Sequence, residues 1–297
     1  MNDLKPSKTA YKVALNILTL GEKPEMAGIL PPGIVDATEK LLITSETAGK
    51  MTIHWSRSRW MISVYEAFDW MMPGQFEAFA HRKAFCERQV REAIDAGATQ
   101  VLVLGAGYDT LGWRLAPLFP QIEFFEIDHP ATACPKAAGI KKMGSHPNLH
   151  LIAVNLGERN LVDVLTEDDI WDHDTSTIIL AEGLLQYLQP QAVQDLFTQC
   201  AAVSRESRIA FTYISTGQDG QPDAGQWTKL VLWLLKNSGE PWLWSMRPGA
   251  LDLFLEEFGW MNAPELLGEY TKRGVELYAV AIKSGQTGCF QERRANA

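Results

Sequence analysis

The run of residues 101–107 constrains the fold of this chain more than any other part of its sequence. Four apolar residues, 101–104, lead directly into Gly105-Ala106-Gly107. Buried parallel strands have such uninterrupted apolar runs, because helices cover both faces of their sheet. Glycine at positions 105 and 107 permits backbone angles that a side chain forbids, and it lets a ligand approach the main chain. The run therefore predicts an α/β sheet with a ligand site at the carboxyl end of this strand.

The residues after the turn argue against a dinucleotide as that ligand. A dinucleotide-binding turn has Gly or Ala three positions after its second glycine, whereas this chain has Thr110. Asp109 lies within the turn, where its charge would repel a pyrophosphate. We therefore expect a ligand without phosphate, or one that carries a positive charge. We also expect Thr110 to cap the helix that follows.

Strands and helices are expected to alternate from residue 100 onwards. The sequence predicts strands over 100–104, 122–127, 149–154, 177–181 and 208–213, with helical patterns between most of them. Strands that alternate with helices form a parallel, doubly wound sheet. An antiparallel strand pair is predicted near the end of the chain, over about 264–270 and 275–282. Upstream, Ser7 is expected to cap a helix, and a long amphipathic helix is predicted over about 74–96.

Polar side chains stand at the end of three of these predicted strands. Asp128 closes the second strand and is placed to accept hydrogen bonds from a ribose diol, although it could instead cap the helix that starts at Pro130. Asn155 follows the third strand, where its amide suits either an adenine contact or a tight turn. Glu182 follows the fourth strand, where an acid can also favour a helix N-terminus. Because the carboxyl ends of parallel strands share one edge of the sheet, we expect these side chains near Gly105.

Charge and cysteine content narrow the setting of the protein. The chain has a formal net charge of −9 and no cluster of Lys and Arg long enough to follow a nucleic-acid backbone, so nucleic acid is not expected as a partner. Its four cysteines include no C-x-x-C pair, which predicts neither a disulfide framework nor a metal site. The first residues lack the apolar run of a signal peptide, and no apolar run is long enough to span a membrane. We expect a reduced, cytoplasmic setting.

Several segments between about residues 80 and 282 carry a more specific signal. They are HRKAFCERQVREAI, LVLGAGYDTLGWRL, FFEIDHP, AVNLGE, LAEGLLQYLQPQAV, GEPWLWSMRPGALDLFLEEFGW and GVELYAVA. In this order and spacing the chain resembles the leucine carboxyl methyltransferase-like family, class I S-adenosylmethionine-dependent O-methyltransferases that include bacterial members associated with polyketide pathways. The resemblance implies a Rossmann-like α/β fold, a doubly wound and mostly parallel sheet of seven strands, with an N-terminal helical cap. It also implies S-adenosyl-L-methionine as the cofactor.

The resemblance assigns roles to residues around the predicted turn. Arg82 matches the family's arginine that pairs with the cofactor's methionine carboxylate, a contact that suits the planar guanidinium group. Glu182 matches the acid near the cofactor's ammonium group, and Asp128 matches the acid that binds the ribose. Asn155 stands where the family usually has Asp before a Leu, so that an amide would make the adenine contact. The expected cofactor-binding residues are Arg82, Gly105, Ala106, Gly107, Asp109, Asp128, Asn155, Leu156 and Glu182.

Three regions are expected along the chain. Residues 1–72 form an N-terminal helical cap, residues 73–284 form the methyltransferase core with a helical lid insertion at about 216–262, and residues 285–297 form a flexible tail. The segment 227–244 is apolar on more than one side. That pattern fits a helix packed under the cap, a lid wall beside a hydrophobic substrate, or a dimer contact. A monomer and a homodimer are both compatible with the sequence.

The expected reaction is methyl transfer to a small-molecule acceptor, at a carboxylate or hydroxyl oxygen. A carboxylate needs no general base, whereas a hydroxyl or thiol could use one, and the sequence offers His54, His81 and Tyr187. Tyr187 matches the family's aromatic position at the mouth of the active site, so Tyr187 and His54 are the candidate catalytic residues. The alternatives are a thiol or a protein C-terminal carboxylate as acceptor, a non-catalytic S-adenosylmethionine-binding protein, and a nicotinamide-dependent oxidoreductase.

Two arginines in the cap are candidates for acceptor binding. Arg57 and Arg59 alternate with Trp55 and Trp60. Guanidinium groups and indole rings could together hold an anionic, partly apolar acceptor, with Tyr187 beside them. Arginines that lie along an apolar surface would give the same pattern.

Overall fold

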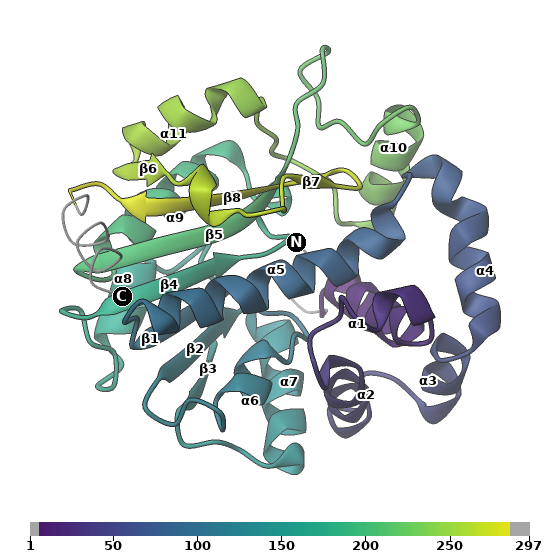
Figure 1. Ribbon diagram of the computed structural model, residues 1–297, viewed down its shortest axis with the longest axis horizontal. Coiled ribbons are helices and arrows are strands. Elements are labelled where there is room, and N and C mark those ends of the chain that lie inside the picture. The colour runs from purple at the N-terminus through teal and green to yellow at the C-terminus, as the bar shows by residue number, and fades with distance from the viewer. Residues whose placement is uncertain (1–5, 286–297) are drawn as a thin grey trace.

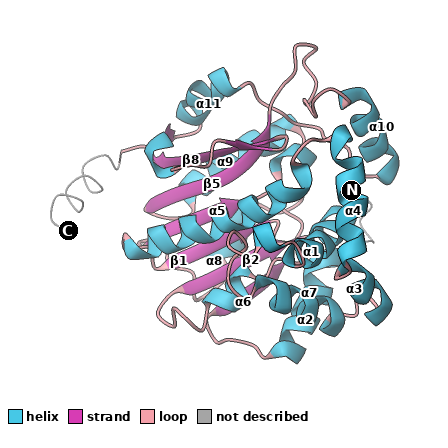
Figure 2. Cartoon of the chain, turned by 45° about the vertical axis from the view of Figure 1, so that its right-hand side comes forward, coloured by secondary structure: helices cyan, strands magenta, loops and turns pink. Residues whose placement is uncertain are grey.

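A mostly parallel β-sheet crosses the molecule, and helices cover both of its faces (Figure 1 and Figure 2). The computed structural model describes residues 6–285 of the 297-residue chain. Its strands are β1 (Gln100–Leu104), β2 (Glu123–Asp128), β3 (Leu149–Ala153), β4 (Ser176–Ala181), β5 (Glu206–Ile214), β6 (Trp260–Asn262), β7 (Lys272–Arg273) and β8 (Glu276–Lys283). Over the described residues they form one sheet in the order β3-β2-β1-β4-β5-β8-β6, with the two-residue β7 beside β8. This order confirms the predicted doubly wound α/β fold and adds one short strand to the expected seven.

The helices fall before, between and after these strands. They are α1 (Lys8–Gly21), α2 (Ile34–Thr44), α3 (Lys50–Ser56), α4 (Arg59–Phe68), α5 (Gln75–Asp95), α6 (Leu111–Leu115), α7 (Pro130–Met143), α8 (Leu161–Thr166), α9 (Pro190–Ala202), α10 (Thr228–Ser238) and α11 (Leu251–Glu257). Short 3-10 turns are η1 (Pro24–Met26), η2 (Asp69–Met71), η3 (Leu185–Tyr187), η4 (Pro248–Ala250) and η5 (Pro264–Leu266). Within residues 6–285, no helix combines the length and apolar character needed to cross a bilayer. The flexible tail predicted over residues 285–297 lies, apart from Gly285, outside the described residues.

The apolar run of β1 is buried on both faces of the sheet. Val101 and Val103 belong to one hydrophobic core, which includes side chains of α5 and α6. Leu102 and Leu104 belong to a second core, which includes side chains of α8, α9 and α11. Successive side chains of a strand point to opposite faces, so a strand between two helical layers must be apolar throughout. These two cores cover β1 on both faces of the sheet. The glycine turn follows at its carboxyl end.

The helices that precede the sheet pack against α5 and α7. Ser7 caps α1 as predicted, because its Oγ accepts a hydrogen bond from the backbone N–H of Ala10 at 3.1 Å. Ile17 of α1 shares a buried cluster with Phe76 of α5. Leu18 shares another with residues of α2 and α7. Helices α1 and α2 are therefore joined to the sheet through α5 and α7.

The last part of the sheet differs from the predicted strand pair. Strand β8 covers the second predicted strand, but residues 264–270 form η5 and a loop instead of a strand. Pro264 has no backbone N–H to donate to a neighbouring strand, and Gly268 has a φ of 59°. The strand lies earlier, at β6, where the fully buried Trp260 donates its indole N–H to the carbonyl of Phe197 at 3.0 Å.

The start of α6 also differs from the prediction. Thr110 occupies the N-cap position, but within the described structure its side chain makes no capping hydrogen bond. Its Oγ1 accepts from Arg114 Nε at 3.2 Å instead. Asp109 supplies the cap, because its Oδ1 accepts from the backbone N–H of Leu111 at 2.9 Å.

Candidate active site

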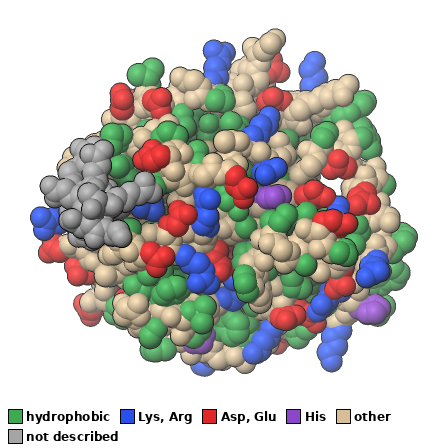
Figure 3. Space-filling view, in the orientation of Figure 1, with side chains coloured by type: hydrophobic (Ala, Val, Ile, Leu, Met, Phe, Trp, Pro, Cys, Tyr) green, Lys and Arg blue, Asp and Glu red, His purple; other side chains and the backbone are tan. Residues whose placement is uncertain are grey.

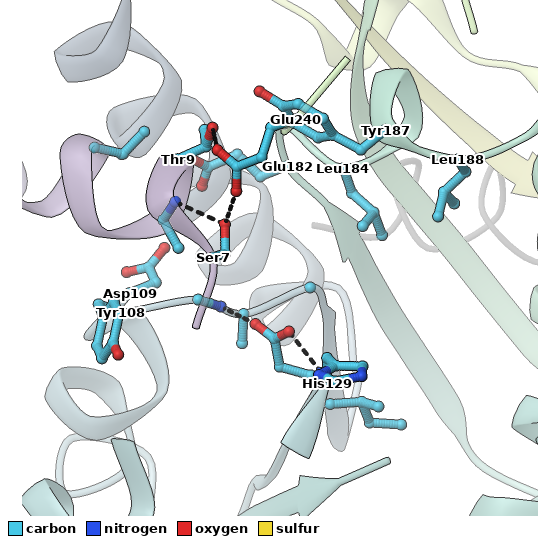
Figure 4. Close-up of a pocket in the computed structure, with 18 of the residues that line it drawn as sticks. Ser7, Thr9, Tyr108, Asp109, His129, Glu182, Leu184, Tyr187, Leu188 and Glu240 are labelled. Carbon is cyan, nitrogen blue, oxygen red and sulfur yellow. Dashed lines mark hydrogen bonds between the residues drawn. The ribbon is translucent and has the colours of Figure 1, made fainter. Parts of the chain in front are cut away.

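A cavity of about 510 Å³ lies at the carboxyl edge of the sheet (Figure 4). It is bordered by the residues that follow β1 to β4, by α1 and α2, and by the loop after α10. All the residues expected to bind the cofactor line it: Arg82, Gly105, Ala106, Gly107, Asp109, Asp128, Asn155, Leu156 and Glu182. Ligands of open α/β sheets bind at this edge.

The glycine turn after β1 forms part of the cavity wall. Gly105 and Gly107 have φ values of 65° and 47°, in the region that favours glycine. A Cβ at position 105 would lie 2.9 Å from Leu184 Cδ1, and a Cβ at position 107 would lie 3.0 Å from Ala10 Cβ. The turn therefore needs glycine for its backbone angles and for its close contacts with neighbouring side chains.

Asp128 holds this turn from the end of β2. Its Oδ2 accepts from the backbone N–H of Gly107 at 2.5 Å, and its Oδ1 accepts from the backbone N–H of His129 at 2.6 Å. Burial raises the pKa of the Asp128 carboxyl group, although the two backbone donors act in the opposite direction. The carboxylate is thus fixed in the cavity wall, where it can also accept hydrogen bonds from a ligand's hydroxyl groups.

Asn155 and Leu156 form the wall after β3. The Oδ1 of Asn155 accepts from the backbone N–H of Gly157 at 3.0 Å, and its Nδ2 donates to Glu158 Oε1 at 2.9 Å. These bonds are those of a tight turn, so Asn155 shapes the loop as well as lining the cavity.

A buried network of charges lies beneath the cavity, between α5 and the strands. Arg82 Nε lies 2.7 Å from Glu182 Oε1, and Arg82 also pairs with Glu276 of β8. Lys83 Nζ lies 2.7 Å from Asp109 Oδ2 and 2.8 Å from Glu182 Oε1. All five side chains are less than a tenth exposed. The network thus has two cations and three carboxylates, and burial raises the pKa of one of these carboxyl groups, that of Glu276.

The network controls the ionisation of its members. Burial alone would lower the pKa of Lys83, but Asp109 and Glu182 raise it above its ordinary value. Burial alone would raise the pKa of Asp109, but Lys83 holds it well below its ordinary value. Lys83 and Asp109 are therefore charged at neutral pH, and neither is available as a proton carrier.

A second polar group joins the cap to the loop after α10 (Figure 4). Ser7 Oγ donates to Glu240 Oε1 at 2.9 Å, and Thr9 Oγ1 donates to the other carboxylate oxygen. Lys8 Nζ donates to the carbonyl of Ser238 at 3.0 Å. Because Ser7, Thr9 and Glu240 all line the cavity, this group of hydrogen bonds closes one side of it. We call Ser7, Thr9 and Glu240 the clasp.

The structure places one of the candidate catalytic and acceptor-binding residues at the cavity and the other three at the surface. Tyr187 of η3 lines the cavity, and burial raises the pKa of its phenol. His54, Arg57 and Arg59 are exposed on or beside α3 and α4, and within residues 6–285 they do not line the cavity. Arg57 is held away from it by Glu22 at 2.9 Å and Glu39 at 2.6 Å, carboxylates at the surface of α1 and α2. In this structure the three side chains therefore lie apart from the cavity, and their role towards an acceptor stays a prediction.

Sequence reasoning missed four residues of the site. Lys83, Glu276, Glu240 and Thr9 were not singled out, although each is buried or lines the cavity. One signal was available for Glu276, since it is an acid inside an otherwise apolar strand. His129, which also lines the cavity, caps α7 with its Nδ1, which accepts from the backbone N–H of Ala131 at 3.2 Å. No group of His, Cys, Asp or Glu in the described part of the chain has an arrangement that could hold a metal ion.

Comparison with known proteins gives the same family as the motifs. The leucine carboxyl methyltransferase family model matches residues 31–201. A Mycobacterium tuberculosis H37Rv protein, provisionally named an S-adenosyl-L-methionine-dependent methyltransferase, is 29% identical over 208 residues, which are 68% of this chain and 56% of the relative. A Mycolicibacterium paratuberculosis protein of the same provisional name is 32% identical over 140 residues, 47% of this chain and 43% of that protein. The matches thus cover about half the length of these curated relatives.

A solved structure supports the fold. A Thermobifida fusca YX protein, provisionally described as a methyltransferase, superposes with a TM-score of 0.56 and 17% identity, over 88% of this chain and 97% of that one. At this identity the likeness concerns the fold alone. The family model, in contrast, covers more than half of the chain and includes the glycine turn, Asp128 and Glu182. The chain belongs to the leucine carboxyl methyltransferase family.

Proposed function

We propose that this chain is an S-adenosyl-L-methionine-dependent methyltransferase that methylates an oxygen of a small, partly apolar acceptor. The observation that carries the proposal is the meeting of Gly105, Asp128, Arg82 and Glu182 in one cavity at the carboxyl edge of the sheet. Asp128, Arg82 and Glu182 each suit a different part of this cofactor. A carboxylate suits the ribose diol, a guanidinium group suits the methionine carboxylate, and an acid suits the ammonium group.

The donor set fits the cofactor on structural grounds as well. The two glycines leave the space that Cβ atoms would fill beside Leu184 and Ala10. The ion pairs of Arg82 use Nε and Nη1, so Nη2 takes part in neither pair and can donate to a ligand carboxylate. The carboxylates of Asp109 and Glu182 at the cavity wall favour a ligand with ammonium and sulfonium groups over one with a pyrophosphate. This last point opposes the nicotinamide-dependent alternative.

The role of the chain in such a reaction is to position the reactants. The bound cofactor supplies an activated methyl group, so the protein gains most by aligning an acceptor oxygen with that group and by excluding water. Arg82, Glu182 and Asp128 would fix the two ends of the cofactor. The clasp and Tyr187 border the same cavity and would close it around the acceptor.

An apolar wall supports a partly apolar acceptor. It consists of side chains from α1, α2 and the loop after α10, namely Val13, Ala14, Ile17, Ile34, Pro241 and Leu243. Polar groups at the cavity wall near these side chains are the hydroxyl groups of Tyr187 and Thr9 and the carboxylate of Glu240. A hydroxyl acceptor could form hydrogen bonds with them, whereas a carboxylate acceptor would be repelled by Glu240. We therefore place hydroxyl acceptors ahead of carboxylates in the order of testing.

The test of the proposed function begins with thermal unfolding of the purified protein. A ligand at about one hundred times its Kd stabilises the folded state by about 2.7 kcal/mol. S-adenosylhomocysteine and S-adenosylmethionine should raise the Tm, and NAD should not. Transfer of a labelled methyl group to hydroxyl, carboxylate and thiol acceptors then distinguishes an enzyme from a non-catalytic binding protein. A Tm increase with NAD alone would overturn the proposal.

A further inference from the structure

Several helices of the molecule expose large apolar side chains instead of burying them. Within the described structure, α4 buries none of its ten residues, and α10 buries only Val231. Trp60 of α4 is 60% exposed, and Trp233 of α10 is 59% exposed. We define the aromatic face as the exposed apolar side chains of α3, α4, η2 and α10 with its preceding residue: Met51, Trp55, Trp60, Phe68, Trp70, Trp227, Leu230, Trp233 and Leu234.

The aromatic face is continuous across these elements. The rings of Trp55 and Trp60 meet edge to face at 5.9 Å between centroids and link α3 to α4. The rings of Trp70 and Trp227 meet at 4.9 Å and link η2 to the start of α10. Helices α3, α4 and α10 lie along one side of the molecule in Figure 1, and they remain together when that side is turned forward in Figure 2. Hydrophobic side chains also lie along this edge in Figure 3.

The aromatic face is basic, although the chain as a whole is acidic. Residues 50–70 and 226–238 contain five Lys and Arg and two Asp and Glu, in a chain with a formal charge of −9. Lys50, Arg59, Lys229 and Lys236 are exposed. Of the two acids, Glu66 pairs with Lys23 at 3.1 Å. Arg57 is paired with Glu22 and Glu39, so the positive charge of the aromatic face comes from Lys50, Arg59, Lys229 and Lys236.

On α10 the charges and the aromatic ring alternate on one surface. Lys229, Trp233 and Lys236 are spaced by four and three positions, so their side chains share one side of the helix. Leu230 and Leu234 lie beside this row and are also exposed. At a bilayer surface an indole ring lies at the headgroup level, and lysines beside it can contact anionic lipid.

The positive charge of the aromatic face favours some binding partners over others. A second copy of the chain would bring two basic surfaces together, which costs electrostatic energy. An anionic bilayer complements both the positive charge and the indole rings. We propose that the aromatic face binds the surface of a bilayer that contains anionic lipid. The proposal concerns peripheral binding and is independent of the proposed methyl transfer.

Vesicle sedimentation tests the proposal with the full chain. Wild-type protein should partition onto vesicles of phosphatidylglycerol and phosphatidylcholine, and much less onto vesicles of phosphatidylcholine alone. The double variant Trp60→Ser/Trp233→Ser should weaken partitioning about tenfold or more, and Lys229→Gln/Lys236→Gln should do the same, because each surface lysine contributes on the order of 1 kcal/mol to anionic membrane binding. Increasing salt should reduce partitioning of the wild type.

Two matched variants serve as controls. Leu253→Ser removes an exposed apolar side chain from α11, and Lys142→Gln removes an exposed cation from α7, both outside the aromatic face. Neither should change partitioning. Equal Tm values would show that the Trp and Lys variants fold, and a blue shift of the wild type's tryptophan fluorescence on anionic vesicles checks the proposal without any variant.

Two results would overturn the proposal. One is the absence of wild-type partitioning onto anionic vesicles. The other is a wild-type dimer in light scattering that becomes a monomer in Trp60→Ser/Trp233→Ser, because the occupant would then be a second copy of the chain.

Discussion

Lys83 Nζ lies 2.7 Å from Asp109 Oδ2, and both side chains are buried at the end of the glycine turn. From the sequence alone, Asp109 is expected to be an uncompensated negative charge. The contact with Lys83 shows that this charge is compensated. The Oδ1 atom of Asp109 caps α6, and its Oδ2 atom pairs with Lys83 of α5. Asp109 therefore fixes the position of the turn relative to α5. The charges of the network that border the cavity are therefore those of Arg82, Lys83, Asp109 and Glu182 together.

Replacement of Lys83 should destabilise the fold more than loss of a surface ion pair. Lys83→Met would leave Asp109 and Glu182 with one buried cation, Arg82, among three carboxylates. Removal of one partner of a buried pair costs about 3–5 kcal/mol, whereas a surface pair contributes about 0–1 kcal/mol. Urea unfolding should give a loss in the first range for Lys83→Met. The surface variant Arg159→Gln, which breaks an exposed pair with Glu167, should lose much less stability than Lys83→Met.

The same pair should make stability depend on pH. Lys83 holds the pKa of Asp109 below its ordinary value in the folded state. Its contribution to the free energy of unfolding is therefore fully present above the ordinary carboxyl pKa and is lost as the pH falls towards the depressed folded value. Asp109→Asn should be less stable than the wild type at neutral pH, and the difference should shrink under acidic conditions. A difference that stays constant between neutral and acidic pH would contradict this assignment.

Arg82 should determine affinity for both forms of the cofactor. Arg82→Lys keeps a buried positive charge for Glu182 and Glu276 but loses the planar group that suits a carboxylate. We expect binding of S-adenosylmethionine and S-adenosylhomocysteine to weaken alike, by about ten- to hundredfold, because both keep the amino-acid end and a charged hydrogen bond contributes about 1.5–3 kcal/mol. Calorimetry can measure both. Arg91→Lys, on the same helix and 40% exposed, is the matched control and should bind as the wild type does.

Asp128 should make cofactor affinity depend on pH. Burial raises the pKa of its carboxyl group in the unliganded protein. The ionised form accepts hydrogen bonds from a ribose diol better than the neutral form, so affinity should fall as the pH decreases through the raised pKa. Asp128→Asn should bind more weakly at neutral pH and lose this pH dependence. Equal pH dependence in the variant and the wild type would assign the titration to another group.

The parts of the fold that the sequence predicts best are those fixed by local pattern. Strand β1 needs an apolar run because it lies between two helical layers, and Asp128 and Glu182 follow from their positions at strand ends. The network around Lys83 was not predicted, because its partners lie 26 and 99 positions away and meet only through the sheet order. The ion pairs of Arg57 were not predictable for the same reason, since Glu22 at the end of α1 and Glu39 of α2 reach it only in the folded chain. The strand expected over 264–270 does not form, because Pro264 lacks a backbone N–H and Gly268 has a positive φ.

The clasp should control how fast a ligand leaves the cavity. Thr9 Oγ1 and Ser7 Oγ both donate to Glu240, which joins α1 to the loop after α10 across the cavity wall. Thr9→Val keeps the shape of the side chain but removes the donor, and a hydrogen bond to a charged group contributes about 1.5–3 kcal/mol. If opening of the clasp limits release, S-adenosylhomocysteine should dissociate about tenfold faster or more from Thr9→Val in stopped-flow fluorescence. Thr44→Val, which removes an exposed hydroxyl from α2, should leave the rate unchanged. Identical dissociation rates for Thr9→Val and the wild type would mean that ligands leave the cavity by a route on which the clasp does not lie.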